Sequence, residues 1–276
     1  MKLTKKYVYE ALKNDYTLFY KAMPKEWKEL FPVLTVDTLD ECGFHFTTQH
    51  NGKMKGMESL STTCKCNDIC KARIAAAFKT AGIDTADPKK ALREYVKRNP
   101  LATNISICGF CFSDSQQDYM TSMTTPSSRN HQILNNGIIH KDWIPTINAL
   151  YFRGESFGDF ASVNAVINFY NLARKNKGVN VTAWTKNINF FVKAREAGHK
   201  KPKNFKLVFS SRFINNPAVV PENATDLIDA VFTVYTEEYA KLQNVEINCG
   251  ARACLSCLRC YTGFGKGVKH VNELLK

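Results

Sequence analysis

Residues 148–187 read NALYFRGESFGDFASVNAVINFYNLARKNKGVNVTAWTKN. Their apolar residues form two short runs, at 148–152 and 179–184, on either side of a segment at 162–176 where they recur at the spacing of one helix face. This pattern predicts a strand, an amphipathic helix and a second strand. The alternation continues downstream with a predicted helix at 188–197 and predicted strands at 205–211 and 229–235.

Strands that alternate with helices of about ten or more residues are typical of right-handed crossover units. We therefore expect an α/β fold with a mostly parallel sheet or a partial barrel. Upstream, the sequence predicts a helix at 4–30, short strands and turns over 33–62, helices at 70–81 and 87–99, and at 105–113 a strand that runs into a loop. We expect one domain over 1–276, made of an N-terminal helical layer at 1–32, an α/β core at 57–245, and a cysteine loop at 246–266 that precedes a short basic tail.

The composition is that of a globular protein. The 276 residues are 44% apolar and 23% charged, and 38 Lys and Arg against 25 Asp and Glu give a formal charge of +13. Neither a long apolar run nor a signal peptide is recognisable, which predicts a soluble cytoplasmic protein with no membrane partner. The chain has ten cysteines. In a reducing compartment, clustered cysteines bind metals or do redox work more often than they form disulfides.

The C-terminal cysteines are closely spaced. Four sulfurs fall within the twelve residues CGARACLSCLRC, at Cys249, Cys254, Cys257 and Cys260. Short gaps let one loop wrap a single ion or cluster, and so this segment predicts either a tetrahedral zinc site or a four-iron cluster. The alternative is a set of buried structural cysteines.

A second cysteine group lies upstream. Cys70 begins a predicted helix, where exposed amides favour a thiolate, and Cys108 and Cys111 follow a predicted strand. Three sulfurs would leave one metal position open for chemistry. A redox dithiol or a structural zinc shared between the segments is the competing interpretation.

Polar residues follow three successive predicted strands. Arg153, Gly154, Glu155 and Asp159 follow the first, Lys186 follows the second, and Ser210 ends the third. The carboxyl ends of parallel strands meet at one edge of a sheet, where ligands bind. We expect Glu155 and Lys186 to be catalytic. The other strand-end residues, together with Glu155, are expected to bind a cofactor. Helix capping is the competing explanation for Asp159.

The ordered motifs CGFCFS (108–113), NALYFRGESFGDF (148–160), VTAWTKN (181–187), LVFSSRFIN (207–215) and INCGARACLSCLRCY (247–261) resemble the phage and prophage family called gene product 88. The resemblance covers roughly residues 57–262 and implies no assigned reaction. The family's Cys-x-x-Cys-Tyr reads Cys-Gly-Phe-Cys-Phe here, and the segment at 71–104 is long. These departures leave open whether Cys70, or instead Cys64 or Cys66, joins the pair at 108 and 111.

The layout is also similar to that of radical S-adenosylmethionine enzymes, which hold a four-iron cluster on three cysteines after the first strand of a partial barrel and carry a Gly-Gly-Glu motif at a strand end. This weaker resemblance implies that Arg153, Gly154 and Glu155 contact S-adenosylmethionine and that the C-terminal cysteines hold an auxiliary cluster. The cysteine spacing of that superfamily is absent from this chain.

The leading functional hypothesis is an iron–sulfur protein of a phage with a site at the strand ends, and it includes a radical S-adenosylmethionine-like enzyme. The alternative is a zinc-stapled, basic nucleic-acid-binding protein without catalysis, which the positive charge favours. A third hypothesis is a partner of a host protein. The oligomeric state is left open.

Overall fold

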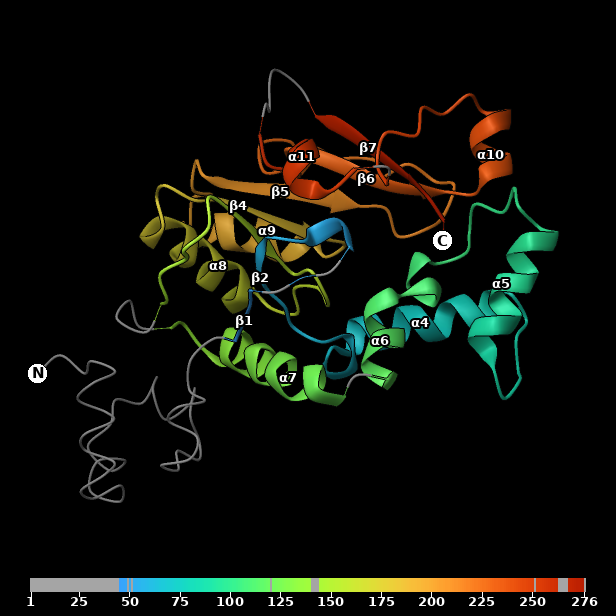
Figure 1. Ribbon diagram of the computed structural model, residues 1–276, viewed down its shortest axis with the longest axis horizontal. Helices are drawn as coiled ribbons and strands as arrows, with labels where there is room; N and C mark the ends of the chain where they lie inside the picture. The colour runs from blue at the N-terminus through green and yellow to red at the C-terminus, as the bar shows by residue number, and fades with distance from the viewer. Residues whose placement is uncertain are drawn as a thin grey trace, which may run out of the picture.

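The computed structural model describes residues 45–48, 50, 52–119, 121–139, 144–250, 252–262 and 268–275, so that the predicted N-terminal layer at 1–32 lies outside it. One sheet runs through the described chain, with its strands side by side in chain order (Figure 1). The strands are β1 (Phe46–Thr47), β2 (Glu58–Leu60), β3 (Tyr151–Gly154), β4 (Asn180–Thr185), β5 (Phe205–Ser210), β6 (Ala230–Tyr235) and β7 (Lys269–Leu274). β1 pairs antiparallel with β2 and every other pair is parallel. The predicted α/β class with a mostly parallel sheet is confirmed, and the sheet stays open.

Among the described residues, four α-helices lie between β2 and β3, and single helices follow β3 and β4 as the sequence pattern predicts. The helices are α4 (Asp68–Thr80), α5 (Pro88–Arg98), α6 (Phe112–Tyr119), α7 (Thr121–Asn136), α8 (Val163–Lys175), α9 (Ile188–Glu196), α10 (Glu237–Leu242) and α11 (Cys254–Cys257). Side-chain caps fix where α4, α5 and α8 begin, because Asn67, Asp87 and Ser162 each accept a hydrogen bond from a first-turn amide. In the described part of the chain, no helix has the length and apolar character needed to span a membrane.

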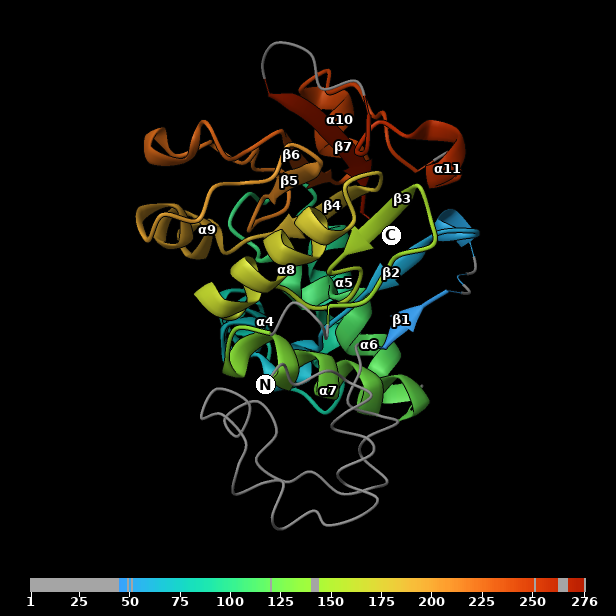
Figure 2. The ribbon, with the colours of Figure 1, turned by 90° about the vertical axis from the view of Figure 1, so that its left-hand side faces the viewer.

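The two faces of the sheet are covered differently. Figure 2 shows α8 and α9 on one side of the strands and α11 on the other. On the helical side, alternate strand residues such as Phe152, Val181 and Leu207 pack into the main core with Phe169 and Phe191.

On the other side a smaller cluster joins Trp184 and Val208 to Tyr261 of the C-terminal cysteine segment. The cysteine segment thus packs on the face of the sheet opposite α8 and α9.

The strand predicted at 105–113 is wrong. Residues Ile107–Phe110 form a 3₁₀ helix and α6 follows, with only a single bridge between Ser106 and Phe213. The Ser106 side chain accepts from the amide of Cys108, which favours the turn over an extended strand. Gly109 allows the turn to press against α4, because a Cβ there would lie 2.7 Å from Ala77 Cβ. The apolar run therefore packs on α4 and α5 rather than in the sheet.

Candidate functional site

Two loops bring four thiols together beyond the ends of β2 and β3. The loop after β2 carries Cys64 in a 3₁₀ turn and Cys70 in the first turn of α4. The second loop is the 3₁₀ helix that carries Cys108, followed directly by Cys111, and it packs against α4. Asn67 anchors the first loop, since its side-chain amide donates to the backbone oxygen of Asp159 at 2.9 Å.

The closest thiols are those of Cys64 and Cys111, whose sulfurs lie 3.7 Å apart. Cys64 also contacts the Cys70 thiol, and Cys108 lies close enough to Cys111 for their charges to interact. Cys66, by contrast, is exposed and points to the hydroxyl of Ser128 at 3.5 Å. The structure therefore brings together the predicted Cys70, Cys108 and Cys111 and adds Cys64, whereas Cys66 lies apart.

The surroundings of Cys108 and Cys111 favour the neutral form of their thiols. A hydrogen bond with Cys64 is the largest cause that raises the pKa of Cys111 far above its usual range, and burial is the next. Burial raises the pKa of Cys108, while the charge of Lys186 acts in the opposite direction. The described cysteines form no disulfide, and no group of three or more Cys, His, Asp or Glu within the described ranges has metal-holding geometry as it stands. Ionisation of these thiols therefore needs a cation nearby.

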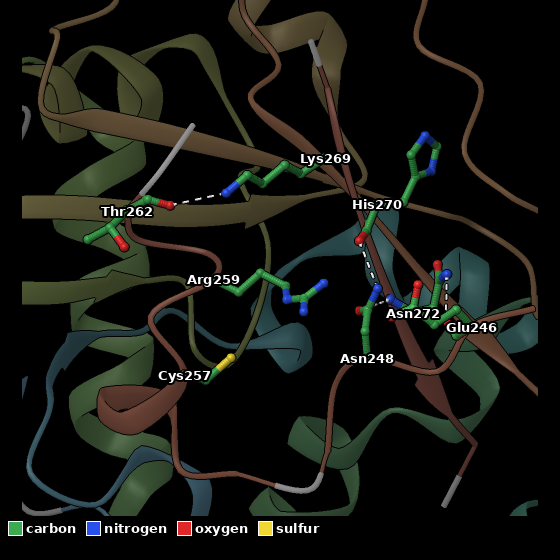
Figure 3. Close-up of a pocket in the computed structure, with 8 residues that line it drawn as sticks. All are labelled: Glu246, Asn248, Cys257, Arg259, Thr262, Lys269, His270 and Asn272. Atoms are coloured by element: carbon green, nitrogen blue, oxygen red, sulfur yellow. Dashed lines mark hydrogen bonds between the residues drawn. The ribbon is translucent and has the colours of Figure 1, made fainter. Parts of the chain in front are cut away.

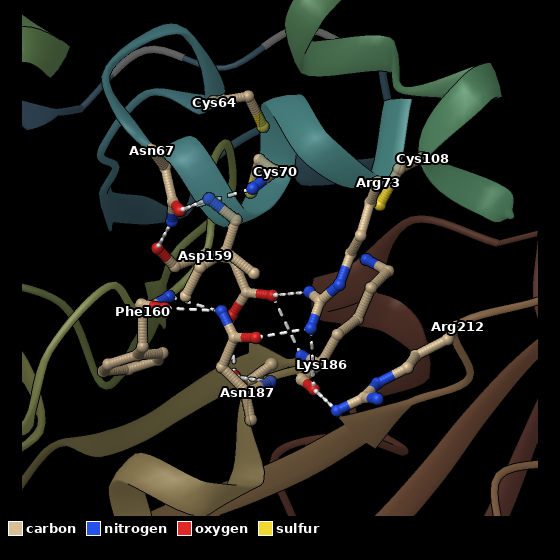
Figure 4. Close-up of polar contacts among 12 residues, drawn as sticks. Cys64, Asn67, Cys70, Arg73, Cys108, Asp159, Phe160, Lys186, Asn187 and Arg212 are labelled. Carbon is tan, nitrogen blue, oxygen red and sulfur yellow. Dashed lines mark hydrogen bonds and ion pairs between the residues drawn. The ribbon is translucent and has the colours of Figure 1, made fainter. Parts of the chain in front are cut away.

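Lys186 supplies such a cation from the end of β4. Figure 4 shows its side chain extending toward the thiols, on the side of Cys108. Burial alone would lower the pKa of Lys186, but the negative charges that Cys108, Asp159 and Cys111 can carry outweigh burial and raise it. Lys186 is thus the charged partner of the thiol group.

Asp159 fixes the backbone of this strand end. Its carboxylate accepts from the Thr185 hydroxyl at 2.6 Å and from the amides of Phe160 and Lys186 at 2.8 and 3.0 Å. The Arg73 guanidinium lies 3.6 Å from the same carboxylate (Figure 4). These contacts position Lys186, whereas the predicted alternative for Asp159, a cap on the next helix, falls to Ser162 instead.

Two arginines complete the positive side of the site. Arg73 donates to the side-chain oxygen of Asn187 at 2.6 Å, and the Arg212 guanidinium lies 3.5 Å from the Lys186 carbonyl oxygen. Burial, and then the charge of Arg73, lowers the pKa of Arg212. Sequence reasoning missed Arg73 as a site residue. Its position one helical turn after Cys70 on α4 was the available signal.

Glu155 lies at the end of β3 in a left-handed backbone conformation, with φ 52°. Its amide donates to Leu60 at 2.8 Å, and one carboxylate oxygen accepts from the amide and hydroxyl of Thr62 at 3.1 and 2.7 Å. The other oxygen is buried and has no hydrogen-bond partner among the described residues. Burial raises the pKa of Glu155 to about 8. The residue therefore holds a proton at neutral pH, beside the loop that carries Cys64.

Three predicted cofactor residues lie elsewhere or serve packing. Arg153 lies toward the opposite face of the sheet, with its guanidinium 3.4 Å from the centre of the Trp184 ring. Gly154 backs onto Phe169 of α8, where a Cβ would lie 2.7 Å from the ring. Ser210 is buried at the end of β5. Of the residues expected at the strand ends, Glu155, Asp159 and Lys186 are the ones found beside the thiol-bearing loops.

The C-terminal cysteines form a separate group on the other face of the sheet. Cys249, Cys254 and Cys260 pack beside Tyr261, and Cys257 is exposed. Burial, together with the charges of the other three cysteines, raises the pKa of Cys260 to about 12.

Two contacts tie the C-terminal group to the rest of the fold. The Lys53 ammonium donates to the Cys249 sulfur at 3.5 Å, and the Thr182 hydroxyl of β4 donates to the Cys260 carbonyl at 3.0 Å. The chain thus carries two cysteine groups, each facing a lysine.

Comparisons with known proteins identify the family of this chain but no individual relative. Searches among curated proteins and among solved structures gave no match. The model of the family described as Gene product 88 matches residues 18–272, which is most of the chain and includes both cysteine groups. The protein that carries these thiols at the ends of its parallel strands therefore belongs to the Gene product 88 family.

Proposed function

We propose that this phage protein binds a metal through Cys64, Cys70, Cys108 and Cys111 at the carboxyl edge of its sheet. The observation that carries the proposal is the 3.7 Å separation of the Cys64 and Cys111 sulfurs. Sulfurs that bind a tetrahedral ion at about 2.3 Å lie about 3.8 Å from one another. This pair therefore has the spacing of two ligands on one ion.

The surrounding charges support a metal bound by four thiolates. Three cations, Arg73, Lys186 and Arg212, flank the site, whereas Asp159 supplies one negative charge. Glu155 adds little charge near pH 7 because of its raised pKa. A divalent ion with four thiolates carries two negative charges, which would balance the two surplus positive charges.

Binding requires the thiols to lose their protons and close around the ion. Each cysteine sulfur swings on a single side-chain torsion, so the four can converge by rotation. Metal binding and proton release are coupled, and the lysine and arginines favour the thiolate forms. In the host cytoplasm, the compartment we propose, thiols stay reduced and available to the metal.

A four-iron cluster is the second candidate. Cysteines follow β2 and Glu155 follows β3, a layout similar to that of radical S-adenosylmethionine enzymes. Thiolates on separate corners of such a cluster lie farther apart than those on one ion, and so the observed sulfur pair favours a single zinc or iron ion. A role for Glu155 and Lys186 toward S-adenosylmethionine belongs to this second candidate alone.

Metal and sulfide analysis of protein purified without oxygen tests the proposal. We expect bound zinc or iron, without acid-labile sulfide, that falls by one site in Cys64→Ser and stays unchanged in Cys66→Ser. Circular dichroism of both variants checks that they fold. Sulfide and a broad visible absorption band would favour the cluster. Equal metal content in the wild type and both variants would show that no metal binds at this site.

A further inference from the structure

A polar pocket lies between the C-terminal cysteine segment at 252–262 and β7, the last strand of the sheet (Figure 3). Its volume of about 590 Å³ is in the range of small-ligand sites. The lining residues are Glu246, Asn248, Cys257, Arg259, Thr262, Lys269, His270 and Asn272. None of them belongs to the strand-end site.

Two asparagines brace one wall of the pocket. Asn248 accepts from the amide of Asn272 at 3.0 Å and donates to the carbonyl of His270 at 3.2 Å, and Asn272 donates to the carbonyl of Glu246 at 3.0 Å. Because these amides are used to hold the backbone, they fix the shape of the wall. Recognition of a ligand therefore falls to the charged side chains.

Among these charged side chains, Arg259 extends into the pocket itself (Figure 3). Leu258 ends α11 in a left-handed conformation, with φ 49°, and Arg259 follows this turn. Figure 3 shows the Arg259 guanidinium reaching into the space between Cys257 and the β7 residues. Within the described chain it has no ion-pair partner. A guanidinium offers a planar fork of donors that matches the oxygens of a phosphate.

Further positive charge lies around Arg259. Lys269 holds its ammonium at the pocket wall, 3.4 Å from the Thr262 carbonyl. Glu246 is the one carboxylate among the lining residues. The pocket is thus positive on a chain whose formal charge is +13.

We propose that this pocket binds a phosphate group, supplied by a nucleic-acid strand or by a free nucleotide. Arg259 grips the phosphate oxygens, and Lys269 adds charge from the facing strand. The proposal does not depend on the strand-end metal, because the two sites share no residue.

Fluorescence anisotropy with a short labelled single strand tests the proposal on the full chain at low salt. Unlabelled strand, adenosine monophosphate and inorganic phosphate serve as competitors. We expect Arg259→Gln to weaken binding by about tenfold or more, and Arg259→Lys to recover part of the loss. Lys241→Gln is the matched control, since it removes the same charge from exposed α10.

The salt dependence gives a second readout. Loss of one phosphate contact lowers the slope of log affinity against log salt by roughly 0.7 for a single strand, and the control leaves the slope unchanged. Stronger competition by the strand than by the nucleotide identifies nucleic acid as the source, whereas equal competition per phosphate identifies the nucleotide. Equal weakening in Arg259→Gln and Lys241→Gln, or no binding of any probe at low salt, overturns the proposal.

Discussion

The sulfur of Cys64 lies 3.7 Å from the sulfur of Cys111, although the two residues are 47 positions apart in the chain. Each belongs to a loop at the carboxyl edge of the sheet, and packing of Gly109 against α4 holds the loops together. The pair has the spacing of two thiolates on one metal ion. It is also the thiol pair best placed to form a disulfide when no metal is present.

Oxidation of metal-free protein should therefore link Cys64 to Cys111. A thiol-specific oxidant is added after chelation, and peptide mapping by mass spectrometry locates the bridge. We expect added zinc to suppress the bridge, because a bound thiolate is shielded from the oxidant. Exposed Cys66 should remain open to alkylation throughout. A bridge that includes Cys66 in place of Cys64 would contradict the arrangement of the loop.

Removal of the charge at Lys186 should shift the loss of metal on acidification to a higher pH. The Lys186 ammonium lowers the pKa of Cys108 against the effect of burial, so Lys186→Gln should raise that pKa further. The pH at which half the metal is lost should rise by about one unit or more. Lys186→Arg should restore the wild-type value.

Exposed Lys193, on α9, provides the control for Lys186. Lys193→Gln removes the same charge away from the thiols and should leave the metal-retention curve unchanged. A similar shift in both variants would mean that net charge, rather than the placement of Lys186, governs retention.

Most of the sheet could be predicted from the sequence because its central strands are recognisable from their local apolar residues. Residues 179–184 and 205–211 are short stretches rich in apolar residues, and the helix between 163 and 175 has a Ser162 cap and one apolar face. β7 was not predicted, since only Val271 of its residues is both apolar and fully buried. β7 is a strand because it pairs with β6 along its whole length, and this long-range pairing cannot be predicted from the local sequence.

The site was predictable to the extent that strand ends could be located. Glu155, Asp159 and Lys186 follow strands, and Asp159 lies near enough to each of the other two for their charges to interact. Arg153 precedes Glu155 by two residues but lies on the other face, because a left-handed residue and a turn follow the strand. The spacing of Arg73 from Cys70 places both on one side of α4, but the approach of Arg73 to Asp159 depends on how α4 crosses the strand ends, which no local pattern gives.

Glu155 should make stability fall as pH rises from about 4.5 to about 8. The folded carboxyl has a pKa of about 8, raised by burial, while the unfolded carboxyl has its ordinary value of 4.5. Between these values the folded state binds the extra proton, so raising the pH favours unfolding. Each unit of difference is worth about 1.4 kcal/mol, and the total is on the order of several kcal/mol.

Glu155→Gln removes this titration and should flatten the dependence of the unfolding free energy on pH across that window. Urea melts of both proteins at a series of pH values provide the measurement. A wild-type curve that rises with pH and a variant curve of the same slope would show that Glu155 is ionised in the folded protein.

Gly158→Ala should destabilise the protein through the loops at the strand ends. Gly158 has φ 90°, and a Cβ there would lie 2.9 Å from the backbone carbonyl carbon of Thr62. A side chain at positive φ costs about 1–2 kcal/mol before the clash is counted. Gly178→Ala is the matched control, because its Cβ would meet no atom within 4 Å.

The two alanine variants separate packing at the site from a general effect of losing a glycine. Urea unfolding should show a loss for Gly158→Ala that exceeds the backbone cost alone, whereas Gly178→Ala should equal or exceed wild-type stability. Displacement of Thr62 also removes the two hydrogen bonds that the Glu155 carboxylate accepts, so the pH window of Glu155 should move in Gly158→Ala alone. Equal unfolding free energies for the two variants would mean that the loops after β2 and β3 do not pack as closely as 2.9 Å requires.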